Sequence, residues 1–403
     1  MTENINSRKD VYIISLLVLL KIIFGVYLVY VNPDFFATPD SDGYIISAKQ
    51  LCDVGKFLNV NSVPEVYRTP GFSIILMPAI CLDLNIKFYI IFLNSLSLLL
   101  SAYLISKIIK IMKINIKSFF IFLIFLLDPT LSRYQYNILN EIVVLFFISL
   151  MLYSFIFGLS KSNPYYFFIG FVILTISTFI RPMTIYLPYL IFLFVCLLFF
   201  SSKFFNFKIR YSFILASFVG VLLHFFLTQS WSNRNNDYAN IRIFTTQSHV
   251  VLYEYITAGI ISKAEKKKWI KYNLENLDAS SINELNNKAK EEFKKALIQY
   301  PIETIQVGLE GALKTFLSPG TGQYPRMLNI SEVNYQKSYY LFVIYGFIWI
   351  LSLWFFSVYG FIKIEKNILF IFILIIFVYL TLVSSGPHSY SRYRIPFYPL
   401  III

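Results

Sequence analysis

The sequence contains few charged residues. Only 14% of its 403 residues are Asp, Glu, Lys or Arg, whereas about a quarter of the positions in soluble domains are charged. Hydrophobic residues make up 57% of the chain, and its 42 Phe and 30 Tyr are more than one soluble core can hide. Apolar runs of about 20 residues recur, each long enough to cross roughly 30 Å of hydrocarbon. The composition therefore excludes an ordinary soluble domain and indicates a membrane protein with several spans.

Cysteine is also scarce. The three cysteines show no paired C-x-x-C spacing, which gives no support to a disulfide framework or a zinc site. Cys52 and Cys81 fall on the same side in the topology derived below and could pair, but we expect them to be free or buried thiols. No Gly-rich phosphate-binding loop is present, so the sequence does not indicate a cytosolic nucleotide-binding site.

The net charge of +13 would suggest a nucleic-acid partner in a soluble protein. In a protein with several spans, Lys and Arg must first be assigned to the two sides of the membrane. Part of the excess then belongs to cytoplasmic loops, and we expect no nucleic-acid partner.

Nine apolar runs are predicted to cross the membrane. They are residues 11–30, 88–109, 118–131, 141–159, 165–180, 183–200, 211–229, 339–361 and 367–385. The first run is too long for a signal-peptide core and lacks a small-residue cleavage site, so we expect it to be retained. With the N-terminus inside, every cytoplasmic connection is short and basic, as the positive-inside rule requires. These connections contain Lys107, Lys110, Lys113 and Lys117, then Lys161, then Lys203, Lys208 and Arg210, then Lys363 and Lys366.

This topology divides the chain into five parts. Residues 1–30 are the N-terminus and first transmembrane helix, 31–87 a first outer loop with amphipathic helices, and 88–229 a transmembrane bundle. Residues 230–338 form an extracytoplasmic loop subdomain, and 339–403 are C-terminal transmembrane helices. Shorter outer connections fall at 128–140, 181–182 and 386–394. The last apolar stretch, 395–403, has nine residues, too few to cross, so we expect a chain cut short within a tenth span.

The two long outer loops differ in character. In residues 41–57, apolar side chains follow the i, i+3, i+4, i+7 pattern of a helix with one apolar face, which would lie along the membrane surface. Asp40 and Asp42 surround its start; one carboxylate suffices to favour a helix N-terminus, so the second, together with Glu65, indicates a site. In the second loop, residues 261–300 are rich in Lys and Glu and end at Pro301. We expect the charge runs 263–268 and 288–295 to be solvated helix faces without a catalytic role.

Several polar residues lie within or beside apolar runs, where charge is costly and often functional. They are Lys21, Asp128, Arg133, Glu141, Arg181 and His224. Lys21 can snorkel or pair with a carboxylate, Glu141 can simply begin its helix, and His224 is expected to be a hydrogen-bonded packing residue. In this topology, however, four of the six fall near the outer face, on the same side as Asp40, Arg68 and Arg234. These four are Asp128, Arg133, Glu141 and Arg181. Their convergence on one side indicates a site there.

The first outer loop carries the closest match to a known family. Pro39-Asp40-Ser41-Asp42-Gly43-Tyr44, followed by Ala48, Leu51, Gly55 and Tyr67-Arg68-Thr69-Pro70-Gly71-Phe72, resembles a pattern of the GT-C superfamily of integral-membrane glycosyltransferases. The likeness is greatest to bacterial relatives of the protein mannosyltransferases and of the lipid A aminoarabinose transferases. Here Phe72-Ser73 stands where Tyr-Pro is common in the family. Weaker matches follow in order: Asn140-Glu141, Arg181-Pro182, Trp231-Ser232-Asn233-Arg234-Asn235, Tyr300-Pro301 and Arg392-Tyr393-Arg394-Ile395-Pro396.

The resemblance implies an all-α, GT-C-like helical bundle with a catalytic first outer loop. Asp40 matches the position of the family's catalytic aspartate, which implies an acceptor-activating base and inversion at the anomeric carbon; Asp42 is the fallback. Moving a sugar from a lipid phosphate also needs cations to stabilise the departing phosphate. Arg68 is the first candidate for that role, with Arg234, Arg392 and Arg394 as further donor-phosphate ligands. Glu65, Tyr67, Glu141 and Arg181 are supporting residues, and whether a divalent cation assists is left open.

The expected activity is transfer of a sugar from a polyprenyl-phosphate donor to a lipid, glycan or protein acceptor of the cell envelope. A lipid-linked donor waits at the bilayer surface, which explains an embedded enzyme. The expected location is the bacterial inner (plasma) membrane, with the site facing the extracytoplasmic side. One alternative is a cell-envelope polysaccharide polymerase or ligase, against which the early Pro-Asp pair argues. Another is a transporter of lipid-linked glycans, for which paired half-repeats are expected and not seen.

Overall fold

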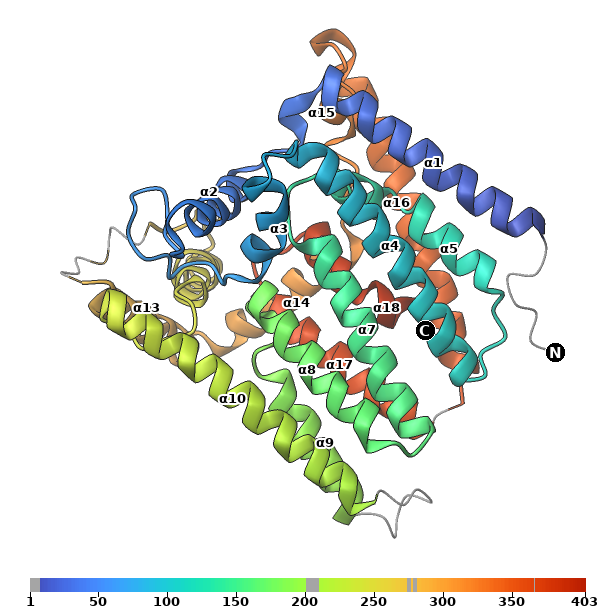
Figure 1. The fold of residues 1–403 in the computed structure, drawn as a ribbon. Coiled ribbons are helices and arrows are strands. Elements are labelled where there is room, and N and C mark those ends of the chain that lie inside the picture. Colours follow the sequence, from blue (N-terminus) through green and yellow to red (C-terminus); the bar gives the residue numbers. More distant parts are fainter. Residues whose placement is uncertain (1–7, 201–209, 274–276, 278–280, 366) are drawn as a thin grey trace.

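The computed structural model describes residues 8–200, 210–273, 277, 281–365 and 367–403 of the chain. These residues form an all-α protein with several candidate membrane spans (Figure 1). Within the described residues no β-strand occurs, and one isolated bridge joins Leu58 and Pro64. Helices satisfy their backbone hydrogen bonds internally, which is what a chain rich in long apolar runs requires in lipid. The prediction of an all-α polytopic membrane protein is confirmed.

Among the described residues, six helical segments are long and apolar enough to cross a membrane. They are α1 (Arg8–Val31), α4 (Ile86–Ile111), α7 (Glu141–Ser160), Pro182–Phe200, which joins η2 (Pro182–Thr184) to α9 (Leu187–Phe200), α10 (Tyr211–Ala239) and α16 (Glu332–Lys363). Three shorter apolar helices coincide with the remaining predicted runs: α5 (Ser118–Leu127), α8 (Pro164–Ile180) and α17 (Ile368–Ser384). Lys203, Lys208 and Lys366 of the predicted cytoplasmic connections lie outside the described residues.

The predicted run 118–131 is not one helix. α5 ends at Leu127 and α6 (Pro129–Tyr134) begins directly after it. The break falls at Asp128, whose carboxylate accepts the backbone N–H of Leu131 at 2.8 Å and so caps α6. Ten residues of α-helix are only about 15 Å long, so α5 alone reaches roughly half-way through the hydrocarbon.

The helices of the bundle differ in how far they are buried. Within the most apolar window of α7, 72% of the residues are buried, whereas α1 and α16 bury only 17% of theirs. α7 packs between α4 and α8, and α8 packs in turn against α10. At the centre, the ring of Phe155 meets those of Phe167 and Phe372, at centroid distances of 4.8 and 5.6 Å. α7 is therefore the central helix, and α1 and α16 present most of their apolar surface outward.

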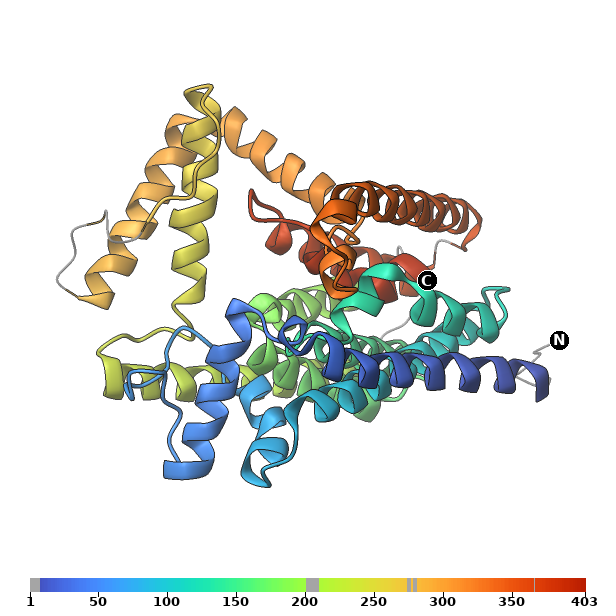
Figure 2. The ribbon, with the colours of Figure 1, turned by 90° about the horizontal axis from the view of Figure 1, so that it is seen from above.

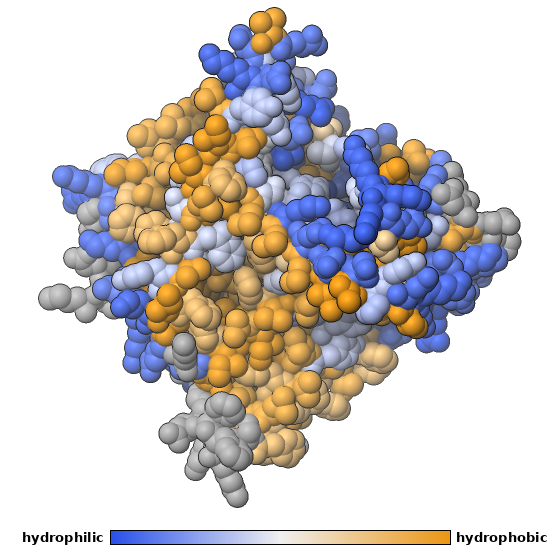
Figure 3. All heavy atoms as spheres, turned by 180° about the vertical axis from the view of Figure 1, so that it is seen from behind, coloured by the Kyte–Doolittle hydropathy of each residue, from blue (hydrophilic) through white to orange (hydrophobic). Residues whose placement is uncertain are grey.

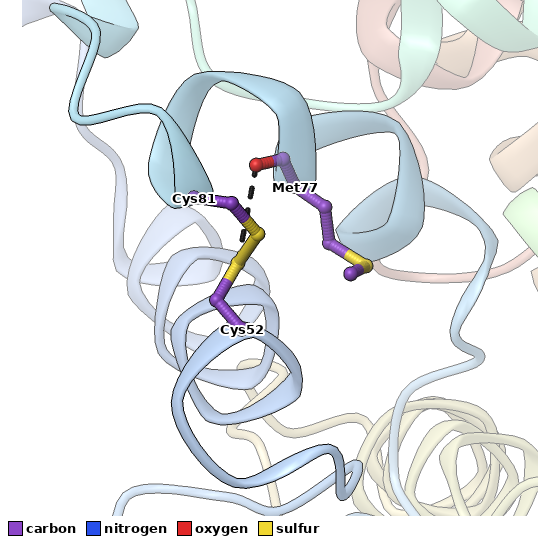
Figure 4. Close-up of a disulfide and its surroundings, with 3 residues drawn as sticks. All are labelled: Cys52, Met77 and Cys81. Atoms are coloured by element: carbon purple, nitrogen blue, oxygen red, sulfur yellow. Dashed lines mark hydrogen bonds between the residues drawn. A yellow bond between two sulfur atoms is a disulfide. The ribbon is translucent and has the colours of Figure 1, made fainter.

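Two short helices lie beside one end of the bundle, joined to α1 through η1 (Pro33–Phe35). They are α2 (Pro39–Val54) and α3 (Gly71–Cys81), and a disulfide between Cys52 and Cys81 links their C-terminal ends (Figure 4). The Cα atoms of the two cysteines lie 5.5 Å apart, within the usual range for a disulfide. The expectation of free or buried thiols is therefore wrong, because the packing of α2 on α3 brings together two cysteines 29 residues apart.

The second long loop folds into a helical subdomain. It contains α11 (Gln247–Val250), the π-helix η3 (Val251–Thr257), α12 (Ala258–Ala264), α13 (Ile282–Gln299), α14 (Pro301–Leu317) and α15 (Tyr324–Met327). Its helices up to α14 project from the bundle at the upper left of Figure 2. A small second core of Ile260, Ala296 and Val307 holds them together. Lys288 and Lys295 pair with glutamates of the same helix, so the charge run of α13 is a solvated helix face, as expected.

The molecular surface differs between the bundle and the loop subdomain. Seen from behind, hydrophobic residues cover the middle and lower part of the molecule, and hydrophilic residues gather towards the right (Figure 3). The chain ends with η5 (Ser391–Phe397) and α18 (Tyr398–Ile402), which pack against α7 and α17. Residues 394–402 are all buried. η5 brings this part of the chain to the end of the bundle where α7 begins.

Candidate functional site

The site is built around the first turn of α2. Thr38 precedes the helix and Pro39 opens it, which suits a proline that has no N–H to donate. The Thr38 N–H donates to the Ser41 hydroxyl at 2.9 Å, and that hydroxyl donates to the Ile138 carbonyl at 2.9 Å. These bonds fix the start of α2 against the segment before α7. Asp40, in the second position of the helix, is held there with 43% of its side chain exposed.

Five charged side chains meet at this point. Arg392 of η5 donates to the Asp40 carboxylate at 2.5 Å and also bonds Glu141, while Arg181 donates to Glu141 at 2.8 Å. Arg68 lies 3.7 Å from Asp40. We call Asp40, Arg68, Glu141, Arg181 and Arg392 the arginine–carboxylate cluster. Its members come from α2, the turn before α3, the start of α7, the end of α8 and η5.

Arg68 is positioned by the loop that carries it. The buried Glu65 carboxylate accepts the backbone N–H groups of Tyr67 and Arg68, at 2.7 and 3.0 Å, and so shapes the turn. The guanidinium lies over the rings of Tyr44 and Tyr67, 5.2 and 5.3 Å from their centroids. It also lies against the backbone of Gly43, where any Cβ would collide with it. At 3.7 Å its contact with Asp40 is longer than a hydrogen bond, so within the cluster its N–H groups remain able to bind an anion.

Glu141 is the buried anchor of the cluster. Its side chain is fully buried at the first position of α7, and one of its oxygens accepts from both Arg181 and Arg392. The other oxygen, Oε2, is buried and has no hydrogen-bond partner. The neighbouring Asn140 donates to the Tyr44 hydroxyl at 3.1 Å and to the Ile180 carbonyl at 3.0 Å. Asn140 and Glu141 thus tie α2, α7, the end of α8 and η5 to one point.

The electrostatics of the cluster favour an anionic ligand. Burial alone would raise the pKa of Asp40, but the guanidiniums of Arg392, Arg68 and Arg181 outweigh it and lower that pKa below its usual value. Burial alone would lower the pKa of Arg392, yet the carboxylates of Glu141 and Asp40 help to raise it well above its usual value. Asp40 and Arg392 are therefore both charged at neutral pH. Three guanidiniums face two carboxylates, so one positive charge has no counter-charge within the cluster.

Five of the predicted site residues lie outside the cluster. Glu65 and Tyr67 support Arg68, as described above, and the other three are Asp42, Arg234 and Arg394. Asp42 lies two residues after Asp40, about 200° round the helix, and is exposed. Arg234 donates to the backbone carbonyls of Glu65 and Phe57, at 2.8 and 2.7 Å, and so clamps the loop that carries Arg68. Arg394 is fully buried and donates to carbonyls at the C-terminus of α14, the nearest at 2.7 Å. Arg234 and Arg394 thus lie apart from the cluster and direct several of their N–H groups to backbone carbonyls; a role for them as phosphate ligands stays a prediction.

Other polar residues beside the spans have structural partners. Asp128 is fully buried and accepts from the Trp349 indole at 2.7 Å and the Tyr398 hydroxyl at 2.6 Å. Arg133 lies over the ring of Tyr134 and reaches the Gly320 carbonyl. Lys21 donates to Ser132 and Gln135, each at 2.8 Å, and no carboxylate partner is found for it among the residues that the structure describes. His224 bonds Thr175 and the Ile185 carbonyl, at 3.2 and 3.0 Å, and is the packing residue expected.

Sequence reasoning missed the aromatic side of the site. Tyr393 lies under the Arg181 guanidinium, with 5.3 Å from ring centroid to Cζ. The His388 ring contacts Tyr393 and Tyr255, each at a centroid distance of 5.2 Å. Burial lowers the pKa of His388 to about 4, so the ring is neutral at neutral pH, and its Nδ1 is buried without a hydrogen-bond partner. Two sequence signals point to this segment: the Arg392-Tyr393-Arg394 motif and the density of Tyr beside Arg in 388–394.

The charged groups do not form an evident metal site. Within the described parts of the chain, no three His, Cys, Asp or Glu side chains lie close enough to hold a metal ion. The two carboxylates of the cluster already bind guanidiniums, which leaves a donor set that favours anions over cations. The divalent cation left open by the sequence therefore enters no step proposed below.

The fold and the site together define the class of protein. It is an all-α membrane protein with several spans and a partly buried charge cluster where helices of its bundle begin or end. No protein-family model, curated protein or solved structure matches the chain. A function for this protein is therefore inferred from its residues and their geometry.

Proposed function

We propose that this protein transfers a sugar from a polyprenyl-phosphate donor to an acceptor of the cell envelope on the extracytoplasmic side of the membrane, as a GT-C-type glycosyltransferase. The observation that carries the proposal is the arginine–carboxylate cluster. It combines one carboxylate that reaches solvent, Asp40, with three guanidiniums, at one end of a bundle of apolar helices. A lipid-linked phosphate presents itself at that depth, because its tail stays in the hydrocarbon.

The guanidiniums supply the site for the donor. Arg68, Arg181 and Arg392 are mostly buried, with 17, 12 and 14% of their side chains exposed, so each keeps a face towards solvent. A phosphate bound there would neutralise the surplus positive charge and accept charge-assisted hydrogen bonds, first of all from Arg68. The same groups stabilise the negative charge that builds on the phosphate as the sugar departs.

Asp40 supplies the acceptor side. Glu141 is fully buried and held by two arginines, so Asp40 is the carboxylate of the cluster that an acceptor hydroxyl or amine can reach. Its lowered pKa makes it a weak base for an isolated hydroxyl. Asp40 therefore orients the acceptor first and takes its proton late, when the bond to the sugar is forming and the acceptor has become acidic.

The proposed step is a single displacement. The acceptor oxygen or nitrogen forms a bond to the anomeric carbon, and the bond between that carbon and the phosphate oxygen breaks. The bonding electrons leave with polyprenyl phosphate, and the acceptor's proton goes to the Asp40 carboxylate. Attack opposite the leaving group inverts the anomeric centre.

Two independent features support an extracytoplasmic site. The Cys52–Cys81 disulfide lies between α2, which carries Asp40, and α3, and disulfides persist in oxidising compartments. Two helices of the bundle have basic residues at their C-terminal ends: Lys110 is in the last turn of α4, and Lys161 directly follows α7. The site lies at the opposite end of α7, which begins with Glu141. The positive-inside rule assigns those basic ends to the cytoplasm.

The test is transfer in isolated membranes. Membranes containing the protein are incubated with labelled polyprenyl-phosphate sugar and an envelope extract, and label is followed from the lipid into the acceptor. We expect transfer by the wild type and by Asp42→Asn, and none above background by Asp40→Asn. Full transfer by Asp40→Asn would remove Asp40 from the reaction. Unconsumed donor, together with movement of lipid-linked glycan across proteoliposomes, would favour a transporter instead.

A further inference from the structure

A cavity with several charged side chains in its lining lies outside the arginine–carboxylate cluster. Its volume is about 220 Å³, and it lies between α12, the segment after α12, α14 and the loop at Pro387. Ligand pockets commonly measure about 300–1,000 Å³, so this one suits a single ring-sized group. The side chains that give it chemical character are Lys263, Lys267, Trp269, Glu310 and Lys314.

The cavity is positively charged. Lys263 pairs with Glu310 across it, and Lys267 pairs with Glu265, outside the lining, at 2.9 Å. Lys314 is exposed, and no ion pair is found for it among the described residues. Three ammonium groups face one carboxylate in the lining, and exposed pairs such as that of Lys267 are weak enough to be exchanged for another anion. The lining therefore suits a ligand with an anionic group.

One wall of the cavity is aromatic. The Trp269 side chain is 39% exposed, and its ring stacks on Tyr255 at a centroid distance of 6.2 Å and an interplanar angle of 25°. An exposed, supported indole face offers a flat apolar surface, against which the C–H face of a pyranose ring can pack while its hydroxyls stay in water. Aromatic face and ammonium groups together match a sugar that carries a phosphate or carboxylate.

The cavity is joined to the cluster by a chain of rings. Trp269 stacks on Tyr255, Tyr255 contacts His388, and His388, next to Pro387 of the lining, contacts Tyr393. Tyr393 in turn lies under Arg181 of the cluster. The Nδ1 atom of His388 in this series of rings is buried and has no hydrogen-bond partner.

We propose that this cavity binds the acceptor of the transfer reaction through a sugar ring that carries an anionic group, and that the four rings line the way from it to the cluster. The donor's phosphate already has the arginines of the cluster, so a separate cationic pocket suits the other substrate. That the bound sugar is the acceptor of the transfer reaction rests on the proposed function. That the cavity binds an anionic sugar does not rest on it.

The test measures binding apart from transfer. Purified full-length protein in detergent micelles is titrated with glucose 6-phosphate, glucose and inorganic phosphate, and binding is followed by ligand-observed nuclear magnetic resonance. We expect glucose 6-phosphate to bind about tenfold more tightly than either of the other probes, because it alone uses both the aromatic wall and the ammonium groups. Equal affinities for the three probes, or no binding, would overturn the proposal.

Variants locate the bound probe. Lys314→Glu and Trp269→Ala are each expected to weaken glucose 6-phosphate binding by about tenfold or more. Trp269→Phe, which keeps an aromatic face, should bind within a few-fold of the wild type, as should Lys294→Glu, an equal charge change at an exposed residue of α13. Both altered lining residues are exposed, so the variants should fold. Wild-type affinity in Lys314→Glu and Trp269→Ala would overturn the assignment.

The two proposals can fail separately. Asp40→Asn should bind glucose 6-phosphate like the wild type, since Asp40 belongs to the cluster and not to the cavity. If transfer depends on Asp40 but the cavity variants bind and transfer normally, the further inference fails alone. If the cavity binds the probe as described but no sugar is transferred from polyprenyl phosphate, the proposed function fails and the binding site stands.

Discussion

Replacing Glu141 by glutamine tests whether the cluster depends on a buried counter-charge. Glu141 is fully buried and binds two guanidiniums through one oxygen. The amide carbonyl of the glutamine can still accept hydrogen bonds, but the negative charge is lost and the surplus positive charge of the cluster doubles. Removing one partner of a buried ion pair typically costs about 3–5 kcal/mol. We expect the free energy of unfolding of Glu141→Gln to fall by that order.

A matched control separates this effect from the helix dipole. Glu332 is the first residue of α16, as Glu141 is of α7, but its side chain is exposed. A carboxylate at an exposed helix N-terminus contributes about 0.3–1 kcal/mol, so Glu332→Gln should cost no more than that. The difference between the two variants, about 2–4 kcal/mol, measures what burial and the arginine partners add.

Denaturant titration of the purified protein in detergent micelles, followed by tryptophan fluorescence, gives the two free energies. A second substitution sharpens the result, because in Glu141→Gln with Arg181→Met one of the two stranded guanidiniums is gone. The double variant should recover at least about 1 kcal/mol relative to the sum of the single changes. Equal stabilities of Glu141→Gln and Glu332→Gln, or strictly additive effects of the two changes, would refute the claim that Glu141 anchors the cluster.

Gly43→Ala should lower transfer by about tenfold or more, since its Cβ would displace the Arg68 guanidinium, which is proposed to bind the donor phosphate; Gly308→Ala, where nothing lies within 4 Å, should be harmless. After mild reduction of intact cells, a membrane-impermeant maleimide should label Cys52 and Cys81, and labelling only after lysis would contradict an extracytoplasmic site. Because the pKa of Asp40 is lowered, its ion pairs stabilise the fold above about pH 4 and weaken as pH falls through the lowered pKa. In an acid titration, Asp40→Asn should therefore lose less stability than the wild type below that pH.

The apolar pattern predicts the helices well because hydrocarbon imposes a length. Each of the nine predicted runs contains an apolar helix, since about 20 apolar residues in lipid have few alternatives to a helix. The run 118–131 shows the limit of the argument. One carboxylate, Asp128, followed by Pro129, turns the chain out of one helix and into another, because an N-cap and a missing N–H outweigh apolar continuity.

The sequence could predict those members of the site that are recognised by their charge and by their predicted side of the membrane. Asp40, Arg68, Glu141, Arg181 and Arg392 were all singled out, and the structure brings them together.

Two of the arginines predicted to bind phosphate show what sequence cannot supply. Arg234 and Arg394 have the same charge and predicted side as Arg68, but tertiary packing places backbone carbonyls within reach of their donors. Carbonyls at a helix end or in a loop leave no mark on the sequence, because every residue has one. The Cys52–Cys81 disulfide could not be predicted from the sequence for a related reason, since its geometry depends on how α2 packs against α3.

Arg392 gives the cluster its dependence on the whole fold. It is the one member that bonds both carboxylates, and it comes from η5, 352 residues along the chain from Asp40 and 251 from Glu141. Without it, Asp40 would keep only the looser contact with Arg68, and Glu141 only Arg181. The segment around η5 also supplies Tyr393 and His388, which join the cluster to the cavity beside Pro387. Donor binding at the cluster and acceptor binding at the cavity would therefore both depend on how residues 387–394 pack. Loosening that segment should impair both functions together, whereas changes confined to Lys314 or to Arg68 should separate them.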